Sequence, residues 1–216
     1  MISLVVVFYL FVAFFAVVGG LRGWAKEMLV VFSVILTLFM IWLFENFLGS
    51  IVTPFIQLDR ALNILPPEVG DAAIYVFPPE QVVPFSALPP EFQTTFRAQF
   101  IIRAVILGFV VFFGYQTPAV LAKFQVSARR EKFQDFLLGL VIGAVNGYLV
   151  IGTLWAYMHQ AHYPFEPYII APNAADPLLE RARMLINSFA PFWLSKVPNI
   201  FIAIVLSLLF ILVVFL

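Results

Sequence analysis

The chain has 216 residues, of which 63% are hydrophobic and 11% are charged, and its mean hydropathy is +1.02. Soluble proteins carry charge on about a quarter of their residues, so this composition excludes an ordinary soluble domain and places most of the chain in lipid. Twelve basic residues balance twelve acidic ones without forming a basic stripe, which excludes nucleic acid as an expected partner.

Five uncharged hydrophobic runs follow one another along the chain, and each approaches the ~20 residues that cross a lipid bilayer. They cover residues 2–21, 28–44, 104–122, 136–158 and 197–216. At about 1.5 Å per residue the last run is just long enough to cross, and the alternative is a segment that enters only one leaflet. We therefore predict an all-α fold, a polytopic membrane helical bundle with four to five transmembrane helices in contact with membrane lipid.

The distribution of lysine and arginine predicts the orientation of these runs. Basic residues gather in the first turn and at 123–135, and short basic connections stay in the cytoplasm, so the N-terminus is expected outside. Arg103, next to the third run, is expected to extend toward lipid headgroups. The predicted units are a transmembrane hairpin at 1–44, a Pro-rich extracytoplasmic connection at 45–99, helices 3 and 4 with a basic cytoplasmic loop at 100–158, an extracytoplasmic connection at 159–196 and a fifth hydrophobic helix at 197–216.

The Pro-rich connection contains Pro-Pro-Glu three times, beginning at Pro66, Pro78 and Pro89. Proline at the first helical position followed by an acid is a helix-start signal, so each triplet is a candidate start of a short helix. The third helix would continue into the run at 104–122. The alternative is a stiff polyproline-like spacer.

Glycines give the fourth run a face without side chains, because Gly139, Gly143 and Gly147 stand four residues apart. Helices in lipid associate where small residues let their backbones approach, so this face predicts a helix-packing surface. The end of the first run offers a similar face, which comprises Gly19, Gly20 and Gly23. We expect the two faces to pack on each other or on a second copy of the chain, which makes a homo-oligomer or a complex with other membrane proteins an expected state.

Asn146 lies within the glycine face, near the middle of the fourth run. An unpaired amide is costly in lipid, so we expect Asn146 to take part in helix packing through a partner on another helix. The alternative is that it contacts a substrate.

The string His159, His162 and Glu166 has the residue types of a zinc site. Pro164 interrupts any helix that would hold the three together, so we interpret the string as an interfacial aromatic and histidine segment and expect no metal. The chain has no cysteine, no nucleophile–base pair and no phosphate-binding glycine motif. We therefore expect neither a cofactor nor an enzymatic activity.

Two segments, 21–29 and 135–147, resemble the colicin V production protein family of bacterial inner-membrane proteins. The first matches its R-G-aromatic-x-[RK]-E-x-L turn, and the second matches its D-x-x-x-G-x-x-x-G-x-x-x-G helix start. The matching motif residues outside the glycine face are Arg22, Gly23, Lys26, Glu27 and Asp135. The chain departs from the family at Asn146, where members commonly carry arginine, and at Ser3, where they commonly carry an acid.

The resemblance implies a multi-pass protein of the bacterial inner membrane, linked to bacteriocin production or export and to envelope homeostasis, without an established catalytic activity. Our leading hypothesis is an integral membrane scaffold or accessory protein that associates through the glycine face. The alternative is a small-solute transporter or channel in which Asn146, Tyr148 and Gln116 contact the solute. A third hypothesis places hydrolysis or metal chemistry at His159 and His162.

Overall fold

The computed structural model describes residues 3–47, 76–121 and 132–215, and every regular element in these ranges is helical. Four helices are long and apolar enough to cross a membrane, and a bent pair raises the number to five if it counts as one span. The predicted all-α membrane bundle is confirmed. Its elements are α1 (Leu4–Arg22), α2 (Trp24–Phe47), the 3₁₀ turns η1 (Pro79–Gln81) and η2 (Phe85–Ala87), α4 (Pro90–Leu121), α5 (Lys132–Gln160), α6 (Leu179–Ser188), α7 (Ala190–Leu194) and α8 (Asn199–Phe215).

Helix α1 has defined local signals at both ends. The side chain of Ser3 accepts a hydrogen bond from the Val5 N–H and caps the first turn. The helix ends at Gly23, which has φ +86°, and the Gly23 N–H donates to the carbonyl of Gly19. Because glycine adopts this left-handed conformation without strain, α2 begins at Trp24 with no intervening loop. We call this end of the bundle the turn end and the opposite end the far end.

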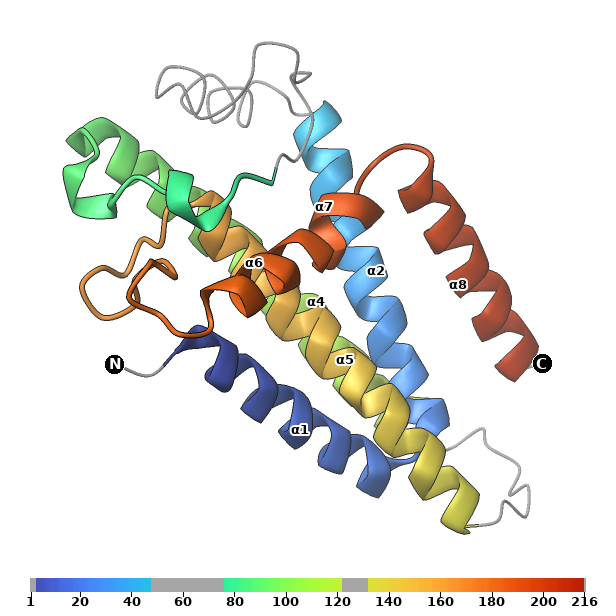
Figure 1. The fold of residues 1–216 in the computed structure, drawn as a ribbon. Helices are drawn as coiled ribbons and strands as arrows, with labels where there is room; N and C mark the ends of the chain where they lie inside the picture. The colour runs from blue at the N-terminus through green and yellow to red at the C-terminus, as the bar shows by residue number, and fades with distance from the viewer. Residues whose placement is uncertain (1–2, 48–75, 122–131, 216) are drawn as a thin grey trace.

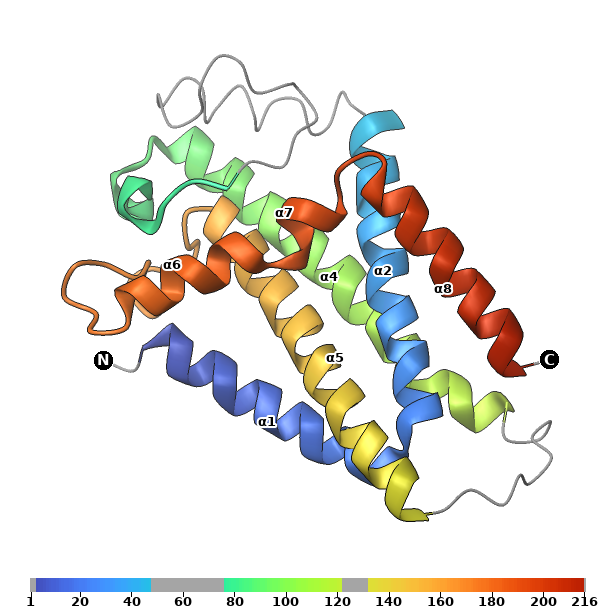
Figure 2. The same cartoon turned by 45° about the vertical axis from the view of Figure 1, so that its right-hand side comes forward.

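Helix α5 runs through the middle of the bundle (Figure 1). Helix α1 lies along one side of it, α2 and α4 along the other, and α8 flanks α2 (Figures 1 and 2). Side chains that face between the helices are buried, as for Leu38 and Phe96 at 0% exposure. Outward-facing side chains such as Leu10, Phe109 and Leu206 are apolar and more than half exposed, which assigns these faces to lipid.

The triplets predicted to open helices do so where the structure describes them. Pro90 is the first residue of α4, and η1 begins at Pro79 with Glu80 in its only turn. The first triplet, at 66–68, lies outside the described residues. Helix α4 continues from Pro90 through residues 90–99 into the run at 104–122, as expected for the helix that the third triplet opens.

The segment predicted as a connection at 159–196 contains two helices. Helices α6 and α7 cross over α5 near the far end (Figures 1 and 2). The chain then bends by 77° into α8, which packs on α2 through Phe201 and Trp42, with 5.0 Å between their ring centroids. Helix α8 has 17 residues and is therefore about 26 Å long. It reaches the length of a full span only together with α6 and α7.

Candidate functional site

The glycine faces of α1 and α5 pack against each other inside one chain. A Cβ atom added to Gly143 would lie 2.9 Å from the Cα of Gly19, and one added to Gly147 would lie 2.9 Å from the Cα of Val12. Real Cβ atoms do not approach other atoms this closely, so only glycine fits at these positions. Gly20 packs under the ring of Phe136. We call this contact the glycine seam, and because α1 covers it, it offers no free surface to a second copy.

The two motif segments meet at the turn end. Asp135, in the first turn of α5, accepts a hydrogen bond of 3.3 Å from the N–H of Trp24, the first residue of α2. A Cβ atom on Gly23 would lie 2.5 Å from an oxygen of Asp135. The carboxylate of one motif therefore caps the helix that the other motif starts, while Lys26 is exposed.

A buried charged group, the Glu27 cluster, comprises Arg22, Glu27, Tyr115 and Asn146. The Glu27 side chain is 0% exposed, and its carboxylate accepts from Arg22 Nη1 at 2.5 Å and from Asn146 Nδ2 at 2.7 Å. Asn146 Nδ2 also donates to the backbone carbonyl of Glu27 at 2.9 Å. Arg22 donates to the Tyr115 carbonyl at 2.9 Å, and its guanidinium lies 4.3 Å from the centroid of that ring. The cluster ties α1, α2, α4 and α5 together.

A second buried charged group, the Arg103 cluster, lies toward the far end and comprises Glu45, Arg103, Tyr157 and Gln160. Arg103 donates to one oxygen of Glu45 through Nε at 3.0 Å and Nη2 at 2.5 Å, and to Gln160 through Nη1 at 2.7 Å. Its guanidinium lies 5.1 Å from the Tyr157 ring centroid. The expectation that Arg103 extends toward headgroups is wrong, since the residue is only 7% exposed. The ends of α2 and α5 supply it with partners inside the bundle.

An apolar layer separates the two clusters. Val30 and Val34 of α2 are 0% exposed and pack against Leu107 and Val111 of α4, with Val150 of α5 beside them. On α2 the layer lies between Glu27 and Glu45, and on α4 it lies between Arg103 and Tyr115. Three helices therefore show the same order of polar, apolar and polar residues.

The residues expected to contact a solute do not come together. Asn146 bonds Glu27, whereas the hydroxyl of Tyr148 donates to the Ser188 carbonyl at 2.6 Å on the side of α6, and Gln116 is exposed. Tyr148 follows Asn146 by two residues, which is about 200° around the helix.

The histidines at the far end are parts of the packing. Trp155 Nε1 donates to the Tyr163 hydroxyl at 3.0 Å, this hydroxyl lies 3.3 Å from His159 Nδ1, and His159 Nε2 lies 2.7 Å from the Phe77 carbonyl. A carbonyl can only accept, so Nε2 carries the proton and Nδ1 accepts from Tyr163. Burial raises the pKa of Tyr163 well above its ordinary value, which keeps this hydroxyl protonated. In the described ranges, no three potential ligand residues gather at one metal-sized site.

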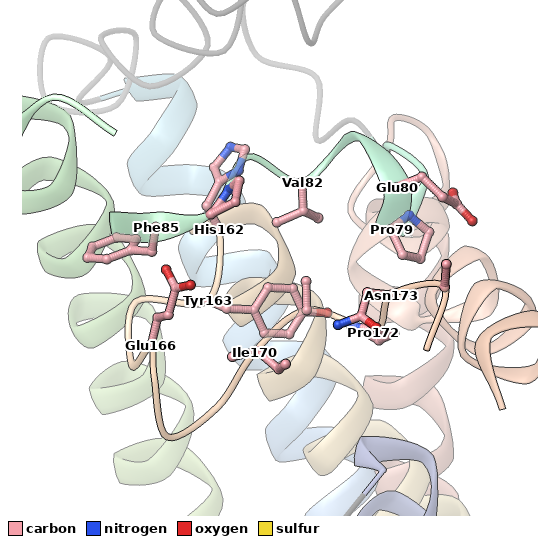
Figure 3. Close-up of a pocket in the computed structure, with 13 residues that line it drawn as sticks. Pro79, Glu80, Val82, Phe85, His162, Tyr163, Glu166, Ile170, Pro172 and Asn173 are labelled. Atoms are coloured by element: carbon pink, nitrogen blue, oxygen red, sulfur yellow. The ribbon is translucent and has the colours of Figure 1, made fainter. Parts of the chain in front are cut away.

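A pocket of about 390 Å³ opens beside these histidines. Figure 3 shows the segment Pro79 to Phe85 along one side of it with His162 next to this segment, and Tyr163 and Glu166 on the other side. Both of its carboxylates have partners, because Glu166 accepts from the Ser86 N–H at 2.8 Å and Glu80 pairs with Arg183. The hydrogen bond from Arg183, together with a backbone N–H, lowers the pKa of Glu80. The pocket therefore presents mainly apolar walls.

The Glu27 cluster is the feature that sequence reasoning missed in part. A partner for Asn146 on another helix is the expected arrangement, but the sequence identifies Glu27 only as a residue of the family motif and not as that partner. An arginine and a glutamate on either side of a glycine turn were the available signal.

Comparison of the chain with protein-family models, with curated proteins and with solved structures finds no match.

Proposed function

We propose that this multi-pass helical membrane protein is a non-enzymatic accessory protein of the colicin V production type, which acts in bacteriocin production or export and in envelope homeostasis. The observation that carries the proposal is the contact between the two motif segments. Asp135 of one segment caps the start of α2 in the other, and Gly19 and Gly143 stand backbone to backbone beside it. Residues that carry the resemblance thus form one contact between the two motif segments.

The chemistry of this contact between the motif segments favours a structural role. Arg22, Glu27 and Asp135 each hold another helix through a hydrogen bond, so none of them is left as a nucleophile or base toward an open site. Partner membrane proteins would contact the bundle on its apolar outer faces, because the glycine seam is closed by α1. The proposed location is the bacterial inner membrane with the turn end in the cytoplasm.

Complementation tests this function directly. The chain is expressed in a colicin V-secreting bacterium that lacks its own member of the family, and bacteriocin activity is measured in the culture medium. We expect the wild-type chain to restore secretion and Asp135→Leu to abolish it. The matched control is Glu91→Gln, an exposed acid in the first turn of α4, which should restore secretion fully. Failure of the wild-type chain, when immunoblots show it in the membrane, would count against the proposal.

The orientation has a separate test, which the absence of cysteine makes simple. Single cysteines replace Lys26 at the turn end and Glu91 at the start of α4, both of which are exposed. An impermeant maleimide applied to intact cells should label the cysteine at 91 and leave the one at 26 unlabelled. The opposite result would invert the proposed topology.

A further inference from the structure

A polar stripe runs along one face of α5 between the two charged clusters. It consists of Asn146, Thr153, Tyr157 and Gln160, with Val150 as the apolar exception. These positions fall within about 80° of one another around the helix and extend about 21 Å along its axis. One end of the stripe reaches the Glu27 cluster and the other reaches the Arg103 cluster.

Several polar atoms along this stripe are buried without a partner. Asn146 Oδ1, Thr153 Oγ1 and the Tyr157 hydroxyl have no hydrogen bond among the described residues, although the three residues are at most 1% exposed. The Tyr115 hydroxyl, on α4, is in the same situation. Buried polar atoms in native proteins are almost always bonded to protein or to internal water, and internal water occupies polar sites of this kind. Three such atoms on one face of one transmembrane helix mark separate positions at which internal water would find a polar partner.

We propose that the interface of α2, α4 and α5 is a proton-conducting track, in which internal water and the hydroxyls of Thr153 and Tyr157 connect the Glu27 cluster with the Arg103 cluster. This function goes beyond the accessory role and does not depend on it. Charged groups inside a membrane are costly and mark ion or proton paths, and here one acid–base pair stands at each end of the stripe. The Arg22 side chain is 22% exposed, so the Glu27 cluster reaches the surface of the bundle at the turn end.

The stripe has the chemistry that proton transfer requires. A hydroxyl can accept a proton from one water molecule and donate its own to the next, so Thr153 and Tyr157 can each pass a proton on without a net change. Asn146 Oδ1 can hold a water molecule beside the Glu27 carboxylate. One proton enters at one cluster and one leaves at the other, and the hydroxyls and water molecules rotate back before the next passage.

The apolar layer acts as the gate of this track. Val30, Val34, Leu107 and Val111 exclude water from the section between the clusters, and apolar constrictions of this kind close a path by dewetting. In the described conformation the track is therefore closed in the middle. A polar side chain in the layer should keep the middle hydrated and open it.

Proton flux into vesicles tests the track. The full chain is reconstituted into vesicles of phosphatidylethanolamine and phosphatidylglycerol that contain a pH-sensitive dye, and a potassium gradient with valinomycin drives proton uptake. Val34→Ser places a hydroxyl in the apolar layer, and we expect it to raise the uptake rate about tenfold over the wild-type chain. Adding Tyr157→Phe to Val34→Ser should return the rate about to the wild-type level, because the relay then lacks one hydroxyl.

Tyr148→Phe is the matched control, since Tyr148 lies on the same helix but bonds Ser188 on the opposite side. In the Val34→Ser background it should leave the flux unchanged. Each variant is first shown to elute as one species and to keep the thermal unfolding profile of its parent. The proposal is overturned if Val34→Ser vesicles take up protons no faster than protein-free vesicles. It is also overturned if Tyr148→Phe reduces the flux as much as Tyr157→Phe does.

Discussion

The glycine seam and the interface of α2, α4 and α5 occupy neighbouring stripes of the same helix, yet they are built in opposite ways. At the seam, Gly19 and Gly143 bring two backbones together with no side chain between them. At the other interface, α5 contributes the amide of Asn146, the ring of Tyr157 and the side chain of Gln160 to two buried charged clusters. The comparison teaches that close packing fixes the position of α5, and this rigidity allows its neighbouring stripe to carry polar groups that cost stability.

Gly143→Ile should break the seam and give the largest effect. The added side chain meets the Gly19 backbone, which cannot move aside as a side chain can, so the destabilisation should exceed the ~3 kcal/mol that marks the upper range of ordinary overpacking. We expect little or no folded protein by size-exclusion chromatography in mild detergent. Gly108→Ile is the matched control, because nothing lies within 4 Å of a Cβ at Gly108. Equal yields of the two variants would refute the tight seam.

Glu27→Leu should break the polar interface and lower the free energy of unfolding by about 3–5 kcal/mol, because Arg22 and Asn146 both lose the buried carboxylate that accepts their hydrogen bonds. The double variant Arg22→Leu, Glu27→Leu should recover a large part of this loss, since it removes the unpaired charge. Denaturant titration in detergent, followed by tryptophan fluorescence, measures both. A double variant that is less stable than Glu27→Leu alone would show that the pair itself stabilises the bundle.

Tyr163→Phe tests the packing at the far end, away from both compared interfaces. It removes the hydroxyl that accepts from Trp155 and donates to His159, and both of these partners are buried. The free energy of unfolding should therefore fall by about 1–3 kcal/mol. The matched control is Tyr168→Phe. Because Tyr168 is 91% exposed, this substitution should change the midpoint of thermal unfolding little. Thermal unfolding separates the two variants. Identical midpoints would disprove the chain of hydrogen bonds that runs from Trp155 through Tyr163 and His159 to the Phe77 carbonyl.

The surface pair of Glu80 and Arg183 should give the smallest effect, and one that depends on pH. The pKa of Glu80 is lowered in the folded protein, so the pair contributes stability above the ordinary pKa of 4.5 and loses it as the pH falls through the lower folded value. Glu80→Gln should therefore reduce the melting temperature slightly at neutral pH and not at all in acid. Glu91→Gln is the exposed control. A difference that persists in strong acid would exclude the ion pair as its cause.

The sequence predicts the helices of this bundle well because each hydrophobic run or helix-start signal is local. Pro90 opens α4 for the reason that its triplet suggests, and small residues at Gly19 and Gly143 identify both sides of the seam. The partners of buried polar groups are harder to predict. Arg103 is buried only because the ends of α2 and α5 bring Glu45 and Gln160 to it, and His159 binds the Phe77 carbonyl from across a long connection. These contacts depend on which helices are neighbours, and hydropathy does not contain that information.

The separation of the two sides of the seam along the chain has a consequence for biogenesis. Gly19 emerges from the ribosome about 120 residues before Gly139, which corresponds to roughly 6 to 24 s at usual rates of synthesis. During this interval α1 stands in the bilayer with its glycine groove uncovered. A membrane insertase or another helix that shields the groove until α5 arrives would therefore raise the yield of correctly assembled protein.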